Sequence, residues 1–313
     1  MSEYKIRDKR GFKLHVYKYD NVKNPKGVIQ ILHGINEHGL RYKEYAEYMN
    51  KAGYVVFIHD HISQGKSRTS LDGDVVYFTW GVSTLLDGVN AVRKEIKRLY
   101  KDLNIYLLGH SMGALLSRLY LNKFENEYKK IILTGTGYSK QKGLGFAILV
   151  GDIIKLTGRK KPSKFFDNMF RKTQLKLNEK VEIEHFIEWL TRDELKTEIN
   201  KNDSFLYIRL SVSAFVDLLR IVKRVSKKPK HFDQKILLLS GTHDPSTSFG
   251  EDTTRLAEMM ESVNIDVSVK LYEEARHDLL QETNRTEVFD DILNFIKEWL
   301  YENVWNNQLL KRF

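Results

Sequence analysis

Short apolar runs that alternate with helix-like segments constrain the fold of this chain more than any other feature. The apolar runs lie at residues 27–32, 54–60, 104–109, 129–135, 235–241 and 266–272. Helical patterns lie at about 41–52, 83–100, 112–125, 251–263 and from 285 onward. Continuous apolar strands are typical of a parallel sheet, because helices cover both of its faces. The pattern therefore predicts an α/β protein with a mostly parallel sheet, preceded by a hairpin over 4–19 that turns at Gly11.

The alternation is interrupted between residues 137 and 232. Three helices are expected in this interval, at 143–158, 183–195 and 212–228, and no strand is indicated. We therefore divide the chain into a core domain, formed by 1–136 and 233–313, and a helical cap, formed by 137–232. The cap is inserted between two strands of the sheet and is expected to cover one end of it.

The composition excludes several classes of protein. None of the 313 residues is a cysteine, so disulfide bonds, cysteine-ligated metal sites and a thiol nucleophile are all excluded. The N-terminal residues are charged and lack the apolar core of a signal peptide, and no apolar run approaches the length of a transmembrane helix. We therefore expect a cytoplasmic protein.

The net charge of +10 is concentrated in the predicted cap. Residues 1–136 have a balance of +8, residues 137–232 of +10 and residues 233–313 of −8, so the two outer segments cancel. Basic residues beside the broad apolar face expected at 143–158 fit peripheral docking onto an anionic membrane surface. A solvated, lysine-rich surface is the alternative. Nucleic-acid binding is not expected, because the basic residues lack interleaved aromatic side chains and form no known motif.

A candidate nucleophile, Ser111, lies in the segment "GHSMG" at 109–113. The segment has the form G-x-S-x-G, and it follows an expected strand and precedes an expected helix. Glycines two positions before and after the serine allow a sharp turn to close without a collision of side chains. This context favours a serine exposed on a strand-to-helix turn as a nucleophile.

A serine nucleophile needs a base and a carboxylate that orients the base. In α/β-hydrolase folds the chain order is serine, acid, histidine, with the last two in loops after late strands. His277 lies between the last expected strand and the last helix, and Asp244 follows the strand before it. We therefore predict Asp244 as the acid and His277 as the base, with Asp217 as the fallback acid.

Four segments resemble the monoacylglycerol lipase and lysophospholipase branch of the α/β-hydrolases, also described as serine-aminopeptidase-like hydrolases. They are "HGINEHGLRY", "HDHISQGKS", "GHSMG", and "SGTHDP" followed by "ARHDLL". The resemblance implies an eight-stranded sheet with the cap between strands six and seven, and a lid role for that cap. It also implies a lipid-like ester substrate, no cofactor, Ser111, Asp244 and His277 as catalytic triad, and the backbone N–H groups of Ile35 and Met112 as oxyanion hole.

The chain departs from the family pattern at four places. It has Ser63-Gln64-Gly65 where relatives usually have G-H-G, and Ala114 where a second glycine usually follows the elbow. Ser246 replaces a common apolar residue after the acid, and Leu280 replaces a polar residue near the catalytic histidine. The last departure weakens a strict glycerol-recognition interpretation.

The segment "ILHGINEHGLRY" at 31–42 raises the question of a metal site, because it holds two histidines. His33 and His38 lie on a non-helical turn with no further ligands near them in the sequence, so no metal is predicted. Glu37 and Arg41 are candidates for a polar site near the leaving alcohol, or for an ion pair that fixes the loop. His110, beside the nucleophile, is a further candidate for substrate binding.

The predicted activity is hydrolysis of carboxylic esters of lipid-like substrates, such as a monoacylglycerol or a lysophospholipid. Alternatives are an esterase or peptidase acting on small soluble substrates, and a non-catalytic ligand-binding protein built on the same fold. The sequence does not indicate the oligomeric state.

Overall fold

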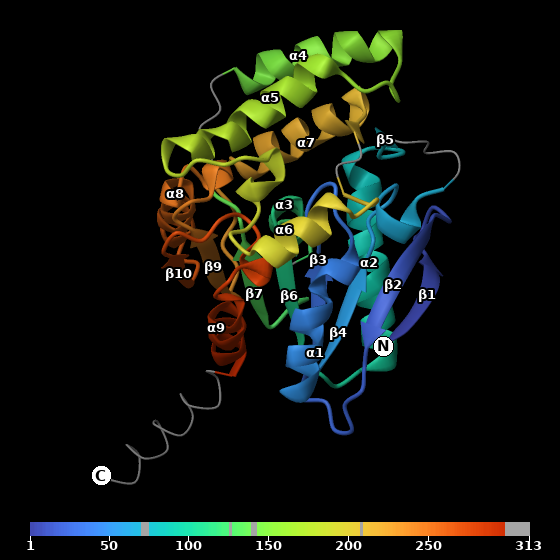
Figure 1. Cartoon of the computed structure of the whole chain (residues 1–313). Helices are drawn as coiled ribbons and strands as arrows, with labels where there is room; N and C mark the ends of the chain where they lie inside the picture. Colours follow the sequence, from blue (N-terminus) through green and yellow to red (C-terminus); the bar gives the residue numbers. More distant parts are fainter. Residues whose placement is uncertain (70–74, 125–126, 139–142, 207–208, 298–313) are drawn as a thin grey trace.

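In the computed structural model the described residues are 1–69, 75–124, 127–138, 143–206 and 209–297. The main sheet has eight strands in the order β1-β2-β4-β3-β6-β7-β9-β10 (Figure 1). Only β2 runs against the other strands, since β1–β2 and β2–β4 are antiparallel and every other pair is parallel, so the mostly parallel sheet predicted from the apolar runs is confirmed. The strands are β1 (Ser2–Arg7), β2 (Lys13–Tyr19), β3 (Gly27–Leu32), β4 (Tyr54–His59), β6 (Ile105–His110), β7 (Lys130–Thr134), β9 (Lys235–Gly241) and β10 (Val267–Tyr272).

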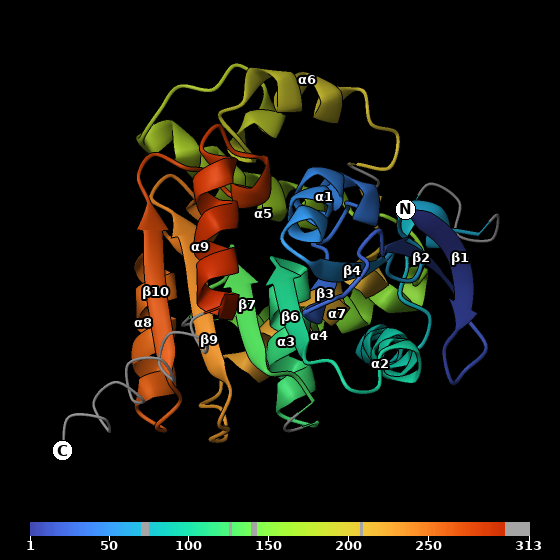
Figure 2. The ribbon, with the colours of Figure 1, turned by 90° about the horizontal axis from the view of Figure 1, so that it is seen from below.

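Helices cover both faces of the sheet, as Figure 2 shows. One face carries α1 (Lys43–Lys51) and α9 (Arg285–Lys297), which share a buried apolar cluster with the sheet. The other face carries α2 (Val82–Leu99), α3 (Met112–Leu121) and α8 (Glu251–Glu261), which share a second cluster with it. This double coverage explains why β3, β4, β6 and β7 are buried along their whole length.

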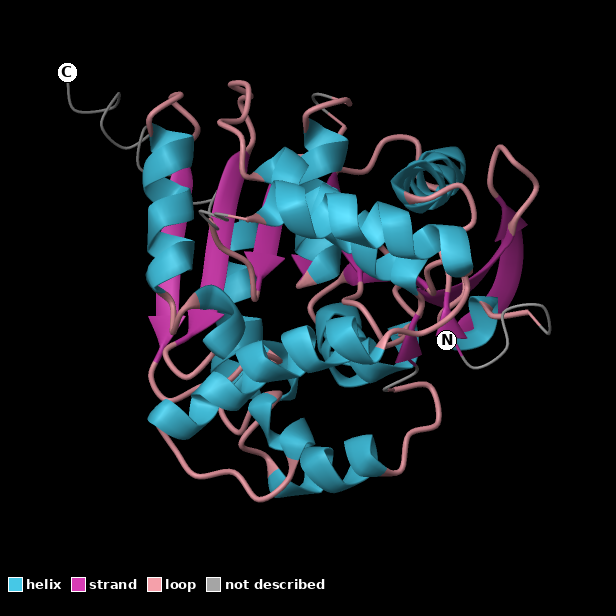
Figure 3. Ribbon diagram, turned by 90° about the horizontal axis from the view of Figure 1, so that it is seen from above, coloured by secondary structure: helices cyan, strands magenta, loops and turns pink. Residues whose placement is uncertain are grey.

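Among the described residues, four α-helices lie between β7 and β9, the sixth and seventh strands of the main sheet in chain order. They are α4 (Leu144–Ile154), α5 (Lys164–Gln174), α6 (Glu194–Lys201) and α7 (Val212–Val225). We call residues 143–206 and 209–232 the inserted segment. Its helices lie over one end of the sheet, with α4 packed against α7 and α7 packed against α3 (Figures 1 and 3). Within the described ranges, no helix is both long and apolar enough to cross a membrane.

The prediction of a helix at 183–195 is wrong. A short 3-10 helix spans Phe186–Trp189, and α6 begins only at Glu194. The side chain of Asp193 accepts the N–H of Lys196 and caps α6, which fixes its start there. The residues between the two elements contact the loop after β10 and are therefore not free to continue a helix.

Two further expectations for the interval 137–232 need correction. Helix α5 was not predicted, although its sequence has the apolar and polar faces of an amphipathic helix. The expectation that no strand occurs there is also wrong, because β8 (Arg209–Leu210) pairs in parallel with β5 (Val75–Val76). A strand of two residues leaves no periodic signal in a sequence.

Candidate active site

Ser111 lies at the sharp turn between β6 and α3. Its backbone has φ 51° and ψ −117°, a conformation that a side-chain-bearing residue adopts only where the surrounding structure enforces it. Gly113 makes this turn possible, because a Cβ atom at that position would lie 1.9 Å from the carbonyl oxygen of Leu32. The strand-to-helix turn predicted from "GHSMG" is therefore present, and it holds Ser111 at the carboxyl end of the sheet.

Asp244 and His277 form a buried pair in the loops after β9 and β10. The Nδ1 atom of His277 lies 2.8 Å from Oδ2 of Asp244. Burial on its own raises the pKa of Asp244, but the neighbouring His277 lowers it below the usual carboxyl value. Burial likewise lowers the pKa of His277, but the charge and hydrogen bond of Asp244 raise it above the usual imidazole value. Each partner therefore stabilises the charged form of the other.

A cavity of about 50 Å³ lies beside this pair, and its wall includes both Ser111 and His277. The loop after β3 contributes Ile35, Glu37 and Arg41, and β6 contributes His110. The inserted segment contributes Trp189, Leu190 and Leu206. The structure thus brings most of the predicted site residues to one cavity, together with three apolar residues that the sequence did not single out.

Ile35 and Met112, the two predicted oxyanion donors, belong to the loop after β3 and to the start of α3, directly after Ser111. Ile35 is half-buried in the cavity wall, and Met112 begins α3. The first N–H groups of a helix have no acceptor within that helix, so the N–H of Met112 is oriented outward at the helix start. The loop of Ile35 is fixed by Gln64, whose Oε1 accepts the N–H of Asn36 at 2.7 Å. Although residues 63–65 depart from the G-H-G pattern, Gln64 still connects this segment to the loop of Ile35.

Glu37 and Arg41 form a buried ion pair at 2.5 Å. Glu37 also accepts hydrogen bonds from the N–H of Gly34 and from Tyr42. On its other side Arg41 lies 2.5 Å from Oδ2 of Asp278. The ion pair expected between Glu37 and Arg41 is therefore present. Contact of these residues with a leaving alcohol remains a prediction.

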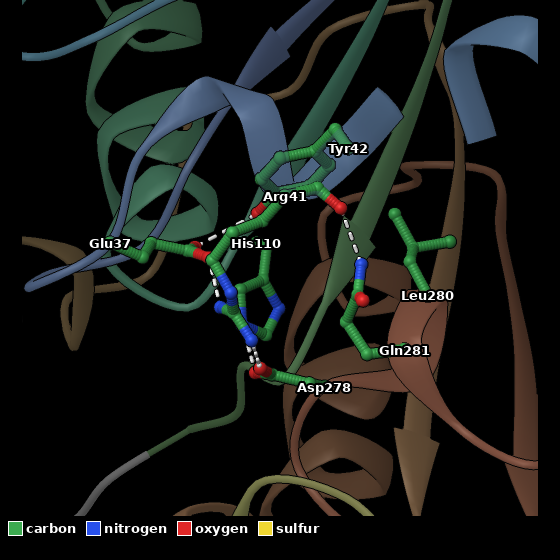
Figure 4. A pocket seen from close by; sticks show the side chains of 7 residues that line it. All are labelled: Glu37, Arg41, Tyr42, His110, Asp278, Leu280 and Gln281. Atoms are coloured by element: carbon green, nitrogen blue, oxygen red, sulfur yellow. Dashed lines mark hydrogen bonds and ion pairs between the residues drawn. The ribbon is translucent and has the colours of Figure 1, made fainter. Parts of the chain in front are cut away.

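His110 joins the same network from the strand side. Its Nε2 lies 3.0 Å from Oδ1 of Asp278, and its Nδ1 lies 2.9 Å from the hydroxyl of Thr134. Figure 4 shows His110 and Asp278, together with Glu37 and Arg41, around a second, smaller cavity. Its volume is about 10 Å³, roughly the space of one water molecule. Burial favours the neutral form of Asp278, but Arg41 and His110 lower its pKa well below the usual carboxyl value.

Comparison with known proteins places this site in a family. The sequence profile of the hydrolase family described as serine aminopeptidase, S33, matches residues 23–284. The chain belongs to this family. Monoglyceride lipase of Rattus norvegicus is 27% identical over 286 residues, covering 90% of this chain and 84% of the relative. A phospholipase of Bacillus subtilis is 25% identical over 277 residues, covering 88% and 97%.

The family fold is also visible in solved structures. A thermostable carboxyl esterase from Bacillus coagulans superimposes with a TM-score of 0.83 at 21% identity, covering 95% of this chain and 98% of that one. The expected α/β-hydrolase fold, with its eight-stranded sheet, is therefore confirmed. Members of the family place their reactive groups in loops at the carboxyl ends of strands, which is where Ser111, Asp244 and His277 lie here.

Besides Leu190 and Leu206, three residues at or beside the cavity were not predicted as part of the site. Asp278 follows the predicted base directly, and its sequence signal was an acidic residue inside "ARHDLL". Trp189 stacks on the ring of His277 with ring centres 4.6 Å apart and an angle of 28°. Ser246 donates a hydrogen bond from its hydroxyl to Asp244 at 2.7 Å, and the same oxygen lies 3.0 Å from Nδ1 of His277.

Potential metal ligands in the described residues converge at one place only, where His110, His277 and Asp278 have ligand atoms within 4.8 Å of one another. These atoms are already engaged, because His110 bonds to Asp278 and His277 bonds to Asp244. In the segment at 31–42, Nδ1 of His33 lies 2.7 Å from the carbonyl oxygen of Gly34. Its Nε2 accepts a hydrogen bond from the backbone N–H of His61. Hydrogen bonds thus account for both ring nitrogens of His33.

Proposed function

We propose that this chain is a serine hydrolase that cleaves carboxylic esters of lipid-like substrates through an acyl-enzyme intermediate. The observation that supports this most is the buried Asp244–His277 pair, whose imidazole lines the same cavity as Ser111. An oriented imidazole beside a serine on a strained turn is the arrangement that activates a hydroxyl for acyl transfer.

In the proposed reaction His277 takes the proton of Ser111 as Oγ forms a bond to the ester carbonyl carbon. The carbonyl oxygen becomes an oxyanion, held by the N–H groups of Ile35 and Met112. Collapse breaks the bond to the alcohol oxygen, which leaves with the proton from His277. A water molecule, deprotonated by His277, then releases the acid and restores Ser111. Removing one oxyanion donor typically costs about 10²–10³ in rate.

The wall of the cavity supports a lipid-like substrate with a polar end. Trp189, Leu190 and Leu206 offer apolar surface, while Glu37, Arg41 and His110 form a charged and polar wall. We assign the polar wall to the leaving alcohol and the apolar wall to the acyl chain. Relatives named as monoglyceride lipase and lysophospholipase support a lipid-like substrate.

The inserted segment is proposed to act as a lid. A volume of about 50 Å³ is far below the roughly 300–1,000 Å³ of typical ligand sites. Since Trp189, Leu190 and Leu206 close one side of this cavity, movement of the inserted segment is needed to admit a long substrate. We therefore propose that residues 137–232 form the cap domain and that residues 1–136 and 233–313 form the core domain.

The cap is also proposed to bring the enzyme to an anionic membrane surface. Phe146, Leu149 and Ile153 are exposed on α4, and Leu156 just beyond it is 86% exposed. Their spacing of three, four and three residues places them on one side of the helix. An apolar face in a segment of net charge +10 fits peripheral binding to anionic lipid. Co-sedimentation with anionic vesicles and not with neutral ones is expected; equal binding at low salt would contradict it.

A hydrolysis panel tests the proposed activity. We expect turnover of monoacylglycerols or lysophospholipids with long acyl chains, and of p-nitrophenyl esters, and no turnover by Ser111→Ala. Preference for acetate esters over all long chains would favour the esterase on small soluble substrates. Cleavage of an N-terminal proline amide alone would favour the peptidase, and no turnover of any substrate would favour the ligand-binding protein.

A further inference from the structure

Trp80 is held in an unusual state on the surface of the core domain. Its side chain is 72% exposed, and its backbone φ is +64°. A bulky side chain rarely occupies this left-handed region, and a tryptophan loses free energy by facing water. The local chain enforces the conformation through hydrogen bonds from the N–H of Gly81 to Phe78 at 2.8 Å and from Ser83 to the carbonyl of Trp80 at 2.9 Å. A strained, exposed aromatic residue points to a role outside the folded chain.

The turn of Trp80 lies where the inserted segment meets the core. Lys160, in the loop after α4, places its Nζ 5.2 Å from the ring centre of Tyr77. The N–H of Ser211 donates to the carbonyl of Val76 at 3.0 Å. The β5–β8 ladder therefore joins the two parts of the chain just before Trp80 (Figure 1).

A second set of contacts connects the turn to α4 itself. The carboxylate of Asp217 on α7 lies 3.1 Å from the position that a Cβ on Gly81 would occupy. Asp217 pairs with Arg220 at 3.1 Å, and Arg220 pairs with Asp152 of α4 at 2.7 Å. The turn that carries Trp80 is thus connected to α4 through Asp217 and Arg220, and the exposed Leu156 follows α4 in the sequence.

The chemistry of this corner fits one kind of partner. Arg159, Lys160 and Lys161, in the loop between α4 and α5, are all exposed. They provide positive charge in the loop that follows the exposed Leu156, and Lys160 contacts the ring of Tyr77, three residues before Trp80. Tryptophan favours the interface between head groups and acyl chains, and nearby basic residues attract anionic lipid.

We propose that Trp80 is a second membrane anchor, inserting its indole into the interface of an anionic phospholipid bilayer beside the end of α4. Anchors on both the core and the inserted segment set the orientation of the enzyme on the bilayer. The inference rests on the membrane docking proposed above and is independent of the chemistry at Ser111.

Trp80→Gly tests the anchor, because it removes the indole and the left-handed strain together. We expect the variant to keep or raise the melting temperature. Its partition onto vesicles of equimolar phosphatidylglycerol and phosphatidylcholine should fall about tenfold, the factor expected when roughly half of a large aromatic side chain is no longer buried. The matched control is Leu99→Ala, since Leu99 is 40% exposed at the opposite end of α2, about 26 Å away. This control should partition as the wild type does.

Fluorescence gives a second readout. Brominated phosphatidylcholine in the anionic vesicles should quench tryptophan emission of the wild type, and the quenched component should disappear in Trp80→Phe. Wild-type partition in Trp80→Gly, or equal quenching in Trp80→Phe, would overturn the anchor while leaving docking by α4 intact. A wild type that stays free of anionic vesicles would overturn docking as well. The anchor would also be overturned if the wild type self-associates and Trp80→Gly abolishes the association, because Trp80 would then bind a second copy of the chain instead of a bilayer. Hydrolysis of soluble p-nitrophenyl butyrate should be unchanged in every variant.

Discussion

Ser246 joins the two charged members of the proposed triad. Its backbone N–H and its hydroxyl both donate to Oδ1 of Asp244, at 2.8 and 2.7 Å, while Oδ2 of the same carboxylate faces His277. An apolar residue was expected at this position from the family resemblance, and the serine of this chain adds a donor to the carboxylate instead. Because both bonds orient the carboxylate and lower its basicity, we regard Ser246 as a positioning residue.

Ser246→Ala is predicted to lower kcat by about tenfold, the effect of losing one hydrogen bond to a charged group. Without this donor the carboxylate of Asp244 acts more strongly on His277, so the acid limb of the pH–rate profile should move to higher pH. Ser246→Thr keeps the hydroxyl and should restore both values, and Ser262→Ala, at the end of α8, should change neither. A Ser246→Ala profile identical to that of the wild type would show that the hydroxyl has no positioning role.

Asp278→Asn is predicted to move the acid limb in the opposite direction. Burial lowers the pKa of His277, whereas Asp244 and then Asp278 raise it. A general base works only when neutral, so its activity is lost as the pH falls through its pKa. Removing the charge of Asp278 lowers that pKa, and activity should persist to lower pH. The check is kcat/KM for p-nitrophenyl butyrate against pH, with the exposed Asp266→Asn as control; a limb shifted upward would refute the assignment.

The sequence predicted that Ser111, Asp244 and His277 would lie together, but not the residues that contact them. Ser111, Asp244 and His277 follow from chain order, because each lies just after a strand whose carboxyl end meets the same edge of the sheet. Asp278 gains its role from Arg41 and His110, which are 237 and 168 positions away in the chain. No local pattern encodes contacts over such separations.

At the scale of elements, the inserted segment is tied to the loop that carries His277. The N–H of Asp278 donates to the carbonyl of Leu190 at 2.7 Å, and the hydroxyl of Thr191 donates to the carbonyl of Gln281 at 2.9 Å. Arg192 lies 3.0 Å from the buried Glu282. With Trp189 stacked on the imidazole, a displacement of residues 188–192 would reach the base directly.

Trp189→Ala is predicted to slow acylation about three- to tenfold, because an aromatic contact of this kind contributes roughly 0.5–1.5 kcal/mol beyond its buried area. Trp189→Phe preserves a stacking ring and should retain most of the rate. The measurement is the rate of labelling by a fluorophosphonate probe, taken well below the melting temperature of each variant. Equal labelling rates for the alanine variant and the wild type would exclude a role for the stack in positioning His277.

The same contacts explain which elements could be predicted. Strands and helices of the core are covered on defined faces, so their periodicity is strong and their positions followed from the sequence. Residues 183–195 carry a helical pattern, but their polar groups bond to the loop after β10 instead. Tertiary contacts thus override local preference in the inserted segment, as they do for the short β5–β8 ladder.

At the scale of the whole molecule, charge and architecture divide along the same boundary. The core segments cancel to a net charge of zero, while residues 137–232 carry the whole excess of +10. The segment that closes the cavity is therefore also the basic one, and its apolar helix α4 lies at the outer surface (Figure 1). In the proposed mode of docking, this arrangement would couple arrival at an anionic surface to access to Ser111.

Ser111 is proposed as the nucleophile of an ester hydrolase, activated by His277. Mass spectrometry of the peptide that contains Ser111, after reaction with a fluorophosphonate probe, tests this proposal. We expect one adduct on Ser111 in the wild type, strongly reduced labelling in His277→Ala, and none in Ser111→Ala. An adduct on another residue, or undiminished labelling of Ser111→Ala, would contradict it.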